Sequence, residues 1–337
     1  MFSKPRIATV TTLKAPLEET LSFVSYHLNS GIDHMYLFFD DPNDDAISHI
    51  SDHRQLTCFR CTQDYWKNNG MRPGTKIQLK QRTNATLAFK YARAKNIEWL
   101  VHLDSDELLF SKTSFKKLFS DISDKIDVIR FPVLEAIPQQ LKYEHPFQDI
   151  HLFKAHLGLK SSYNDFTILP ADQKKQLKRA KFWYRRKKLY HILANNIKER
   201  SSNFLLGHTV GKAATRTTTD IRYIENHLPV TNSDKKPFIK ISQNGYILHY
   251  DCQGYSSWKN KWKSRINGSA NFDITRFSKQ RRKQMQLFRE ASSKGEQEIK
   301  NLFKNLYHLT KYEQTILYLT GLLKKINHDP DLFTSKS

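Results

Sequence analysis

The sequence has few of the features of secreted or membrane-spanning chains. It contains 3 cysteines among 337 residues, too few for a disulfide framework. No window approaches the roughly 18 uncharged apolar residues of a transmembrane helix. Residues 1–10 enter a strand-like stretch without the apolar core and small-residue cleavage site of a signal peptide. We therefore expect a cytoplasmic protein of a reducing compartment.

Acidic residues are scarce relative to basic ones. The chain has 55 Lys and Arg residues against 33 Asp and Glu residues, a formal net charge of +22. The positive electrostatic potential of such a chain favours anionic partners, namely nucleotide phosphates, nucleic acid or acidic lipid. The hydrophobic content of 39% is ordinary for a globular protein. The charge thus indicates a kind of partner but says nothing about the fold.

The first 137 residues alternate between strand-like and helix-like patterns. Apolar runs predict strands at residues 6–13, 35–39, 56–61, 98–103 and 127–137. Helical spacing predicts helices at residues 17–28 and 76–95. Strands separated by helices of this length predict an α/β, Rossmann-like domain with a mostly parallel central sheet flanked by helices. Ligands of such sheets bind outside the carboxyl ends of the strands, here residues 11–14, 40–45 and 104–107.

The rest of the chain divides into four expected parts. They are a basic insertion, the remainder of the core, a helical C-terminal extension and a frayed tail, at residues 138–206, 207–254, 255–328 and 329–337. Within the insertion, Lys174–Lys188 holds nine basic residues in fifteen together with three aromatic ones. Such a run suits a nucleic-acid surface, a face lying on anionic lipid, or ordinary solvated charge. These alternatives stay open.

Three carboxylates follow an apolar run directly, as Asp104, Asp106 and Glu107. Burying charge is costly unless it is paired or holds a metal. Alternate residues of a strand share one face, so we expect Asp104 and Asp106 to point together into the crevice. Carboxylate oxygens suit Mg²⁺ or Mn²⁺, which also bridge to substrate phosphates. The sequence therefore predicts a metal site at the end of a central strand, with an acidic turn facing solvent as the alternative.

The segment Trp99–Leu109 resembles the metal motif of GT-A glycosyltransferases, in their family-2-like and family-92-like branch. Leu108 stands where a Phe is usual. Other segments resemble the same branch in the same order: residues 11–41, Gly211–Arg216 with His227–Pro229, and Leu248–Tyr250 with Trp258 and Lys261. Ala-Pro at residues 15–16 replaces the usual Asn-Glu. The resemblance spans about residues 6–265 and rests on the order of these short segments.

This resemblance implies a GT-A fold whose residues 1–137 bind a nucleotide-diphosphate sugar, expected to be a UDP-sugar. Asp106 with Asp104 would hold Mn²⁺ or Mg²⁺, and the ion would stabilise the diphosphate leaving group. His249 is a candidate third metal ligand or a contact to the diphosphate, with a packed histidine as the alternative. Contacts to the donor are expected from Thr11, Asp40, Asp41, Asp104, Lys212 and Arg216.

The resemblance also implies a hexosyltransferase that inverts the anomeric centre, which requires a general base near the acceptor hydroxyl. Glu135, at the end of an apolar run, is the candidate base, and a solvated strand-end Glu is the alternative. The expected acceptor is a glycan or a lipid-linked glycan such as lipopolysaccharide. Without an anchor segment, we expect a bacterial enzyme in peripheral contact with the anionic inner face of the membrane.

Two other classes of protein compete with this interpretation. One is a nucleic-acid-binding protein or Mg²⁺-dependent nuclease, with Asp104 and Asp106 beside a basic groove. The other is a non-catalytic binding module of the same fold, which the intact carboxylates argue against. The order of the matching segments favours the glycosyltransferase, so nucleic acid is not the expected partner. Cys58 and Cys61 have redox or half-zinc spacing but lie within a predicted strand, which indicates packing.

Overall fold

The computed structural model describes residues 4–155, 211–232, 236–267 and 279–334, together with Arg185 and Lys188. Most of the expected insertion, including all but two residues of the basic run Lys174–Lys188, lies outside the described residues. Among the helices that are described, none has the length and apolar content needed to cross a bilayer.

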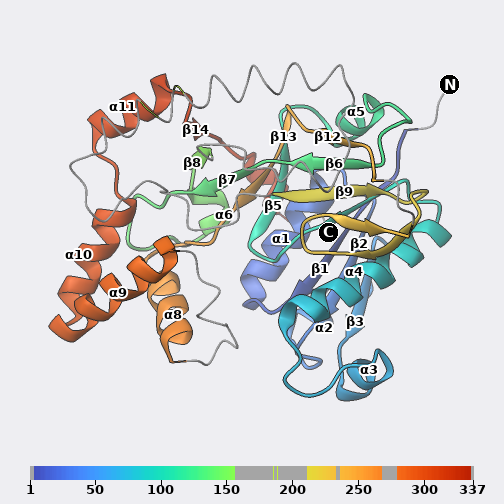
Figure 1. Ribbon diagram of the computed structural model, residues 1–337, viewed down its shortest axis with the longest axis horizontal. Helices are drawn as coiled ribbons and strands as arrows, with labels where there is room; N and C mark the ends of the chain where they lie inside the picture. The colour runs from blue at the N-terminus through green and yellow to red at the C-terminus, as the bar shows by residue number, and fades with distance from the viewer. Residues whose placement is uncertain are drawn as a thin grey trace.

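The centre of the molecule is a seven-stranded sheet with the order β12-β6-β9-β4-β1-β2-β3 (Figure 1). Neighbours β4, β1, β2 and β3 run parallel, whereas β9 is antiparallel to both β4 and β6. The bounds are β1 Ile7–Leu13, β2 His34–Phe39, β3 Leu56–Arg60, β4 Trp99–His102, β6 Val128–Phe131, β9 Lys212–Arg216 and β12 Ile239–Ile241. The predicted α/β class with a mostly parallel central sheet is confirmed.

Both faces of this sheet are covered, because alternate residues of β1 enter different cores. Ile7 and Leu13 pack in the cluster that contains α1 (Leu17–Asn29). Ala8 and Val10 pack in the cluster that contains α4 (Ile77–Ala94). A strand buried on both faces reads as a continuous apolar run, which is why β1 was visible in the sequence. Shorter helices are α2 Ala46–Ile50, α3 Gln63–Asn68, α5 Phe115–Ser120 and α6 Pro146–Asp149.

A second, five-stranded sheet has the order β14-β8-β7-β13-β5. Its strands are β5 Glu107–Ser111, β7 Val133–Ala136, β8 Leu152–Ala155, β13 Gly245–His249 and β14 Leu323–Lys325, and a separate hairpin joins β10 Ile221–Ile224 to β11 Pro229–Thr231. At three places the chain passes directly from a strand of the larger sheet to a strand of the smaller one: from β4 to β5, from β6 to β7, and from β12 to β13.

The single strand predicted over residues 127–137 is wrong, because Pro132 divides it into β6 and β7. Proline has no N–H to give to a ladder, and here the chain changes sheets. The Pro132 carbonyl accepts from the Ile247 amide at 2.9 Å, which begins the pairing of β7 with β13.

The expected helical C-terminal extension is present and forms its own core. Helices α8 (Tyr255–Ile266), α9 (Lys279–Lys294) and α10 (Glu296–Tyr307) pack around Trp258 and Phe303, at one end of the molecule in Figure 1. Helix α11 (Lys311–Leu319) leads into β14.

The expectation of a frayed tail from residue 329 is wrong for residues 329–334. They include a 3₁₀ turn, η3 (Pro330–Phe333), that docks on α1. The Asn29 side-chain amide donates to the carbonyls of Asp331 at 3.0 Å and Thr334 at 2.8 Å. Phe333 is buried with its ring 5.2 Å from that of Tyr26. An apolar anchor and two hydrogen bonds therefore hold this segment.

Candidate functional site

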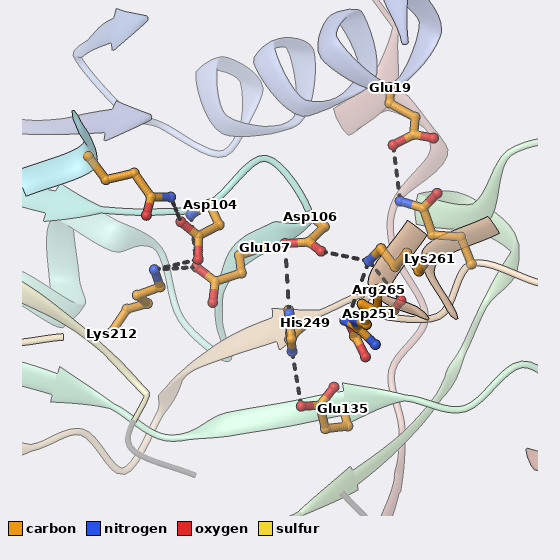
Figure 2. A network of polar contacts seen from close by, with 12 residues as sticks. Glu19, Asp104, Asp106, Glu107, Glu135, Lys212, His249, Asp251, Lys261 and Arg265 are labelled. Carbon is orange, nitrogen blue, oxygen red and sulfur yellow. Dashed lines mark hydrogen bonds and ion pairs between the residues drawn. The ribbon is translucent and has the colours of Figure 1, made fainter. Parts of the chain in front are cut away.

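The acidic motif lies at the carboxyl end of β4, in the turn that leads into β5. Strand β4 ends at His102, so Asp104 and Asp106 occupy a turn and the expected alternation of a strand does not apply to them. The two carboxylates contact different groups, as Figure 2 shows. Asp104 contacts Gln81 and Lys212, whereas Asp106 contacts His249 and Lys261.

A buried lysine neutralises the Asp104 side of the turn. Lys212 Nζ lies 2.7 Å from Asp104 Oδ2 and 3.4 Å from Glu107 Oε2, and its side chain is 1% exposed. Burial alone would raise the pKa of Asp104, but the Lys212 ammonium lowers it. Burial would likewise lower the pKa of Lys212, but the two carboxylates raise it. Lys212, predicted to contact donor phosphate, is thus held within the protein by Asp104 and Glu107.

The Asp106 side of the turn contains a cluster of three potential metal ligands. Single ligand atoms of Asp106, His249 and Asp251 all lie within 4.8 Å of one another. His249 Nε2 is 3.7 Å from Asp106 Oδ1. The sequence predicted two of these residues as ligands and missed Asp251. The signal was available, because Asp251 closely follows apolar β13 as Asp104 follows β4.

Glu135 contacts the His249 ring at Nδ1, on the side away from Asp106. The parallel pairing of β7 with β13 places these two residues side by side, and His249 Nδ1 lies 2.9 Å from Glu135 Oε1. Burial alone would lower the pKa of His249, but the carboxylates of Glu135 and Asp106 raise it well above its usual value. With Nδ1–H donating to Glu135, Nε2 faces Asp106. The structure therefore places Glu135, the candidate base, in an enclosed position as a partner of His249.

A second lysine lies between the carboxylates of the cluster. Lys261 Nζ is 3.1 Å from Asp106 Oδ2 and 3.3 Å from Asp251 Oδ1. Arg265 also approaches Asp251, at 3.5 Å. Burial would raise the pKa of Asp251, but these cations lower it. An ammonium already occupies the space between the two carboxylates, so this donor set attracts positive charge and, with the imidazole, suits a divalent cation.

Glu19, for which the sequence predicted no role, approaches this network from the first turn of α1. Gln253 donates to Glu19 Oε2 at 3.1 Å. Burial raises the pKa of the Glu19 carboxyl, the charge of Lys261 lowers it, and that of Asp106 raises it. Figure 2 shows Glu19 pointing toward the cluster from above.

The predicted nucleoside contacts lie on the neighbouring strands. Thr11 is buried in β1. Asp40, directly after β2, pairs with Lys80 at 2.6 Å. Asp41 is exposed and accepts from the Asn43 amide at 2.9 Å. Both aspartates thus sit at the carboxyl edge shared with Asp104.

Arg216 lies at the opposite edge of the sheet. Strand β9 is antiparallel to β4, so Arg216 pairs with Trp99 at the amino end of β4. There it forms an ion pair with Glu98, and its guanidinium carbon is 4.2 Å from the Trp99 ring centroid. We therefore leave Arg216 out of the site.

An acidic cluster at the carboxyl edge of a parallel α/β sheet is a common position for metal-dependent sites that bind phosphates. The chain matches no known family model. It is similar to two glycosyltransferase-like proteins of Arabidopsis thaliana. One is 28% identical over 172 residues, covering 45% of this chain and 34% of the relative. The other is 24% identical over 277 residues, covering 75% of this chain and 55% of the relative. The chain thus spans about half or less of each relative, and these similarities support the class of glycosyltransferase-like proteins.

Solved structures show only distant likeness. Core-mannan synthase A from Aspergillus fumigatus, in a Mn/GDP form, has a TM-score of 0.28 and 12% identity, covering 41% of this chain and 45% of its own. HddC from Yersinia pseudotuberculosis has a TM-score of 0.33 and 10% identity, covering 76% and 97%. At TM-scores this low, neither match carries an argument about the present chain.

Proposed function

We propose that this chain is a metal-dependent glycosyltransferase. It transfers a hexose, with inversion, from a nucleotide-diphosphate sugar such as a UDP-sugar to a glycan or a lipid-linked acceptor such as lipopolysaccharide. The observation that carries the proposal is the cluster of Asp106, His249 and Asp251 at the carboxyl edge of the sheet. The similarity to glycosyltransferase-like proteins supports it.

The three clustered residues would hold Mn²⁺ or Mg²⁺. When bound, the ion supplies Lewis-acid stabilisation of the diphosphate that leaves the sugar. Lys261 and Arg265 add positive charge beside the cluster, where they can pair with phosphate oxygens. Glu135 acts as a positioning residue in this proposal, because it orients the His249 ring as outer carboxylates do in many metal sites.

The nucleoside would lie over the adjoining strand ends. The Asp40 carboxylate suits a ribose hydroxyl, and Thr11 lies within the neighbouring strand β1. Lys80, paired with Asp40, also lies 4.6 Å from the centroid of the Trp66 ring. A base and ribose at this edge would bring the diphosphate toward the acidic turn, since all these strands end on the same side.

Thermal unfolding tests the proposal. UDP with Mn²⁺ should raise the melting temperature of the full chain, and EDTA should abolish the increase. Asp106→Ala should remove it, whereas Asp52→Ala, which changes an exposed acid far from the motif, should keep it. Hydrolysis of a panel of nucleotide-sugars then identifies the donor. Absence of any nucleoside-diphosphate response, together with salt-sensitive binding to DNA or RNA, would contradict the proposal.

We also propose that the enzyme works in peripheral contact with an anionic membrane, because its net charge is +22. Flotation with liposomes tests this separately. Recovery should be greater with vesicles that contain phosphatidylglycerol than with neutral ones, and equal recovery would remove the membrane from the proposal.

A further inference from the structure

A cavity of about 630 Å³ opens beside Asp104, on the side of the turn away from the metal cluster. It lies between the first turns of α4 and the segment that joins β10 to β11. Its walls are largely apolar, with Ile77 from α4 and Leu228, Pro229 and Val230 from the hairpin. This volume falls within the range of ordinary small-molecule sites.

The charge of this cavity differs from that of the whole protein. The chain has 55 Lys and Arg residues among 337, yet none is among the described residues that line the cavity. Two carboxylates, Asp104 and Glu225, do line it. The His227 ring also lines the cavity, and burial lowers its pKa. Lys212 pairs with Asp104 at 2.7 Å and Arg82 pairs with Glu225 at 3.2 Å, so the charge of both carboxylates is balanced. The lining therefore offers carboxylate and amide oxygens to a neutral ligand that donates hydrogen bonds.

A chain of amide groups leads from the hairpin to the acidic turn. Asn226 donates to Gln81 Oε1 at 3.1 Å, and Gln81 donates to Asp104 Oδ1 at 2.7 Å. The Asn226 side-chain oxygen is buried and accepts no hydrogen bond from the residues that the structure describes. An unpaired buried acceptor is costly, so a donor from a ligand would stabilise it. Carboxylate and amide oxygens beside apolar side chains match a ring that has hydroxyls at its edge and C–H groups on its faces.

We propose that this cavity binds the neutral pyranose ring of a sugar substrate. The inference rests on the proposed function, because it names the part of the substrate that lies on the Asp104 side of the turn. Asp104 precedes Asp106 by two residues, so the cavity and the metal cluster flank one turn. The ring belongs either to the donor sugar or to the acceptor, which share this chemistry.

Two substitutions that obstruct the cavity test the proposal. Val230→Phe fills it from the hairpin, and Gln78→Trp, at an exposed position, obstructs its mouth without disturbing the core. Ile221→Phe is the matched control, because it enlarges a half-buried aliphatic side chain of the same hairpin that does not line the cavity. Calorimetry with the full chain and Mn²⁺ measures the affinity for UDP, for a panel of UDP-hexoses and for a panel of methyl hexopyranosides.

We expect both obstructing variants to bind UDP as the wild type does and to lose sugar-dependent binding. Loss of the advantage of a UDP-hexose over UDP assigns the cavity to the donor sugar, and loss of methyl-glycoside binding assigns it to the acceptor. The proposal is overturned if sugar binding survives in both variants, if UDP binding itself is lost, or if the wild type binds no sugar in either panel. A wild type that binds glycosides but not UDP would contradict the proposed function and leave this inference standing.

Discussion

Asp104 and Asp106 stand two residues apart in one turn, yet their surroundings give them different chemistry. Lys212, which neutralises Asp104, has a side chain that is 1% exposed, whereas Lys261, which contacts Asp106, is 36% exposed. A buried ammonium cannot move away without leaving its carboxylate partners uncompensated, whereas a half-exposed ammonium can move into water. In the proposed site we therefore expect Asp106, rather than Asp104, to be the ligand of a metal ion. The contrast shows that spacing along the chain does not define a ligand set.

Removing the charge of Asp106 should have the largest effect. We expect Asp106→Asn to lower the transfer rate by about four orders of magnitude, because a metal-stabilised leaving group accounts for several kcal/mol of the barrier. Initial rates of sugar transfer measure this. A variant that retains at least a tenth of the rate, at saturating Mn²⁺, would show that Asp106 is not a ligand.

Removing Lys212 should damage stability more than any other lysine of the site. Lys212→Met leaves the buried Glu107 and the part-exposed Asp104 uncompensated, which should lower the free energy of unfolding by about 4 kcal/mol. Lys261→Met is the matched control, and it should cost less than about 1 kcal/mol because Lys261 is itself 36% exposed and Arg265 still pairs with Asp251. Urea unfolding measures both. Equal losses of unfolding free energy would show that Lys212 and Lys261 stabilise the two sides of the turn alike, which would contradict the prediction.

Weakening the support of His249 should have an intermediate effect. Glu135→Gln removes the charge that orients and polarises the ring, so we expect Mn²⁺ to bind about tenfold more weakly. Glu144→Gln, an exposed carboxylate, is the control and should leave the affinity unchanged. Calorimetric titration with Mn²⁺ decides the point, and identical isotherms for the two variants would contradict a positioning role.

The smallest change is expected at Asp104. Asp104→Asn should alter the affinity for Mn²⁺ by less than about threefold, because its charge is already neutralised by Lys212. The same titration, run beside Asp106→Asn, provides the comparison. If both variants bind Mn²⁺ equally weakly, both carboxylates are ligands of the metal, and the expected difference between Asp104 and Asp106 is wrong.

Local patterns predicted the two long helices of the first half and most of its strands, but not its short helices. The helix expected at residues 76–95 is Ile77–Ala94, because its apolar spacing follows one helical face. The division at Pro132 was missed because the apolar run continues through it. No local sequence pattern shows which of two sheets a strand joins. Strand β5 was missed because it begins at Glu107, the last residue of the acidic motif itself. The docked tail had a signal in Leu332 and Phe333, apolar residues in an otherwise polar end.

The site was predictable where it follows strand ends and unpredictable where it depends on sheet order. Asp106 and His249 each stand at such an end, and the same reasoning extends to Asp251. The contact of Glu135 with His249 joins residues separated by 114 positions and requires β7 to lie beside β13. Nothing in the neighbourhood of either residue encodes that pairing, so the sequence suggested a base where the structure has a partner of the imidazole.

The acidic turn is also a joint between the two sheets, because β4 belongs to the larger and β5 to the smaller. The cluster draws on that turn, on the end of β13, and on the connection to α8. An ion held there would join the turn between the two sheets to the end of β13. By thermodynamic linkage, the free energy of binding the ion would add to the free energy of unfolding, so the concentration of the metal would affect the stability of the protein as well as its turnover.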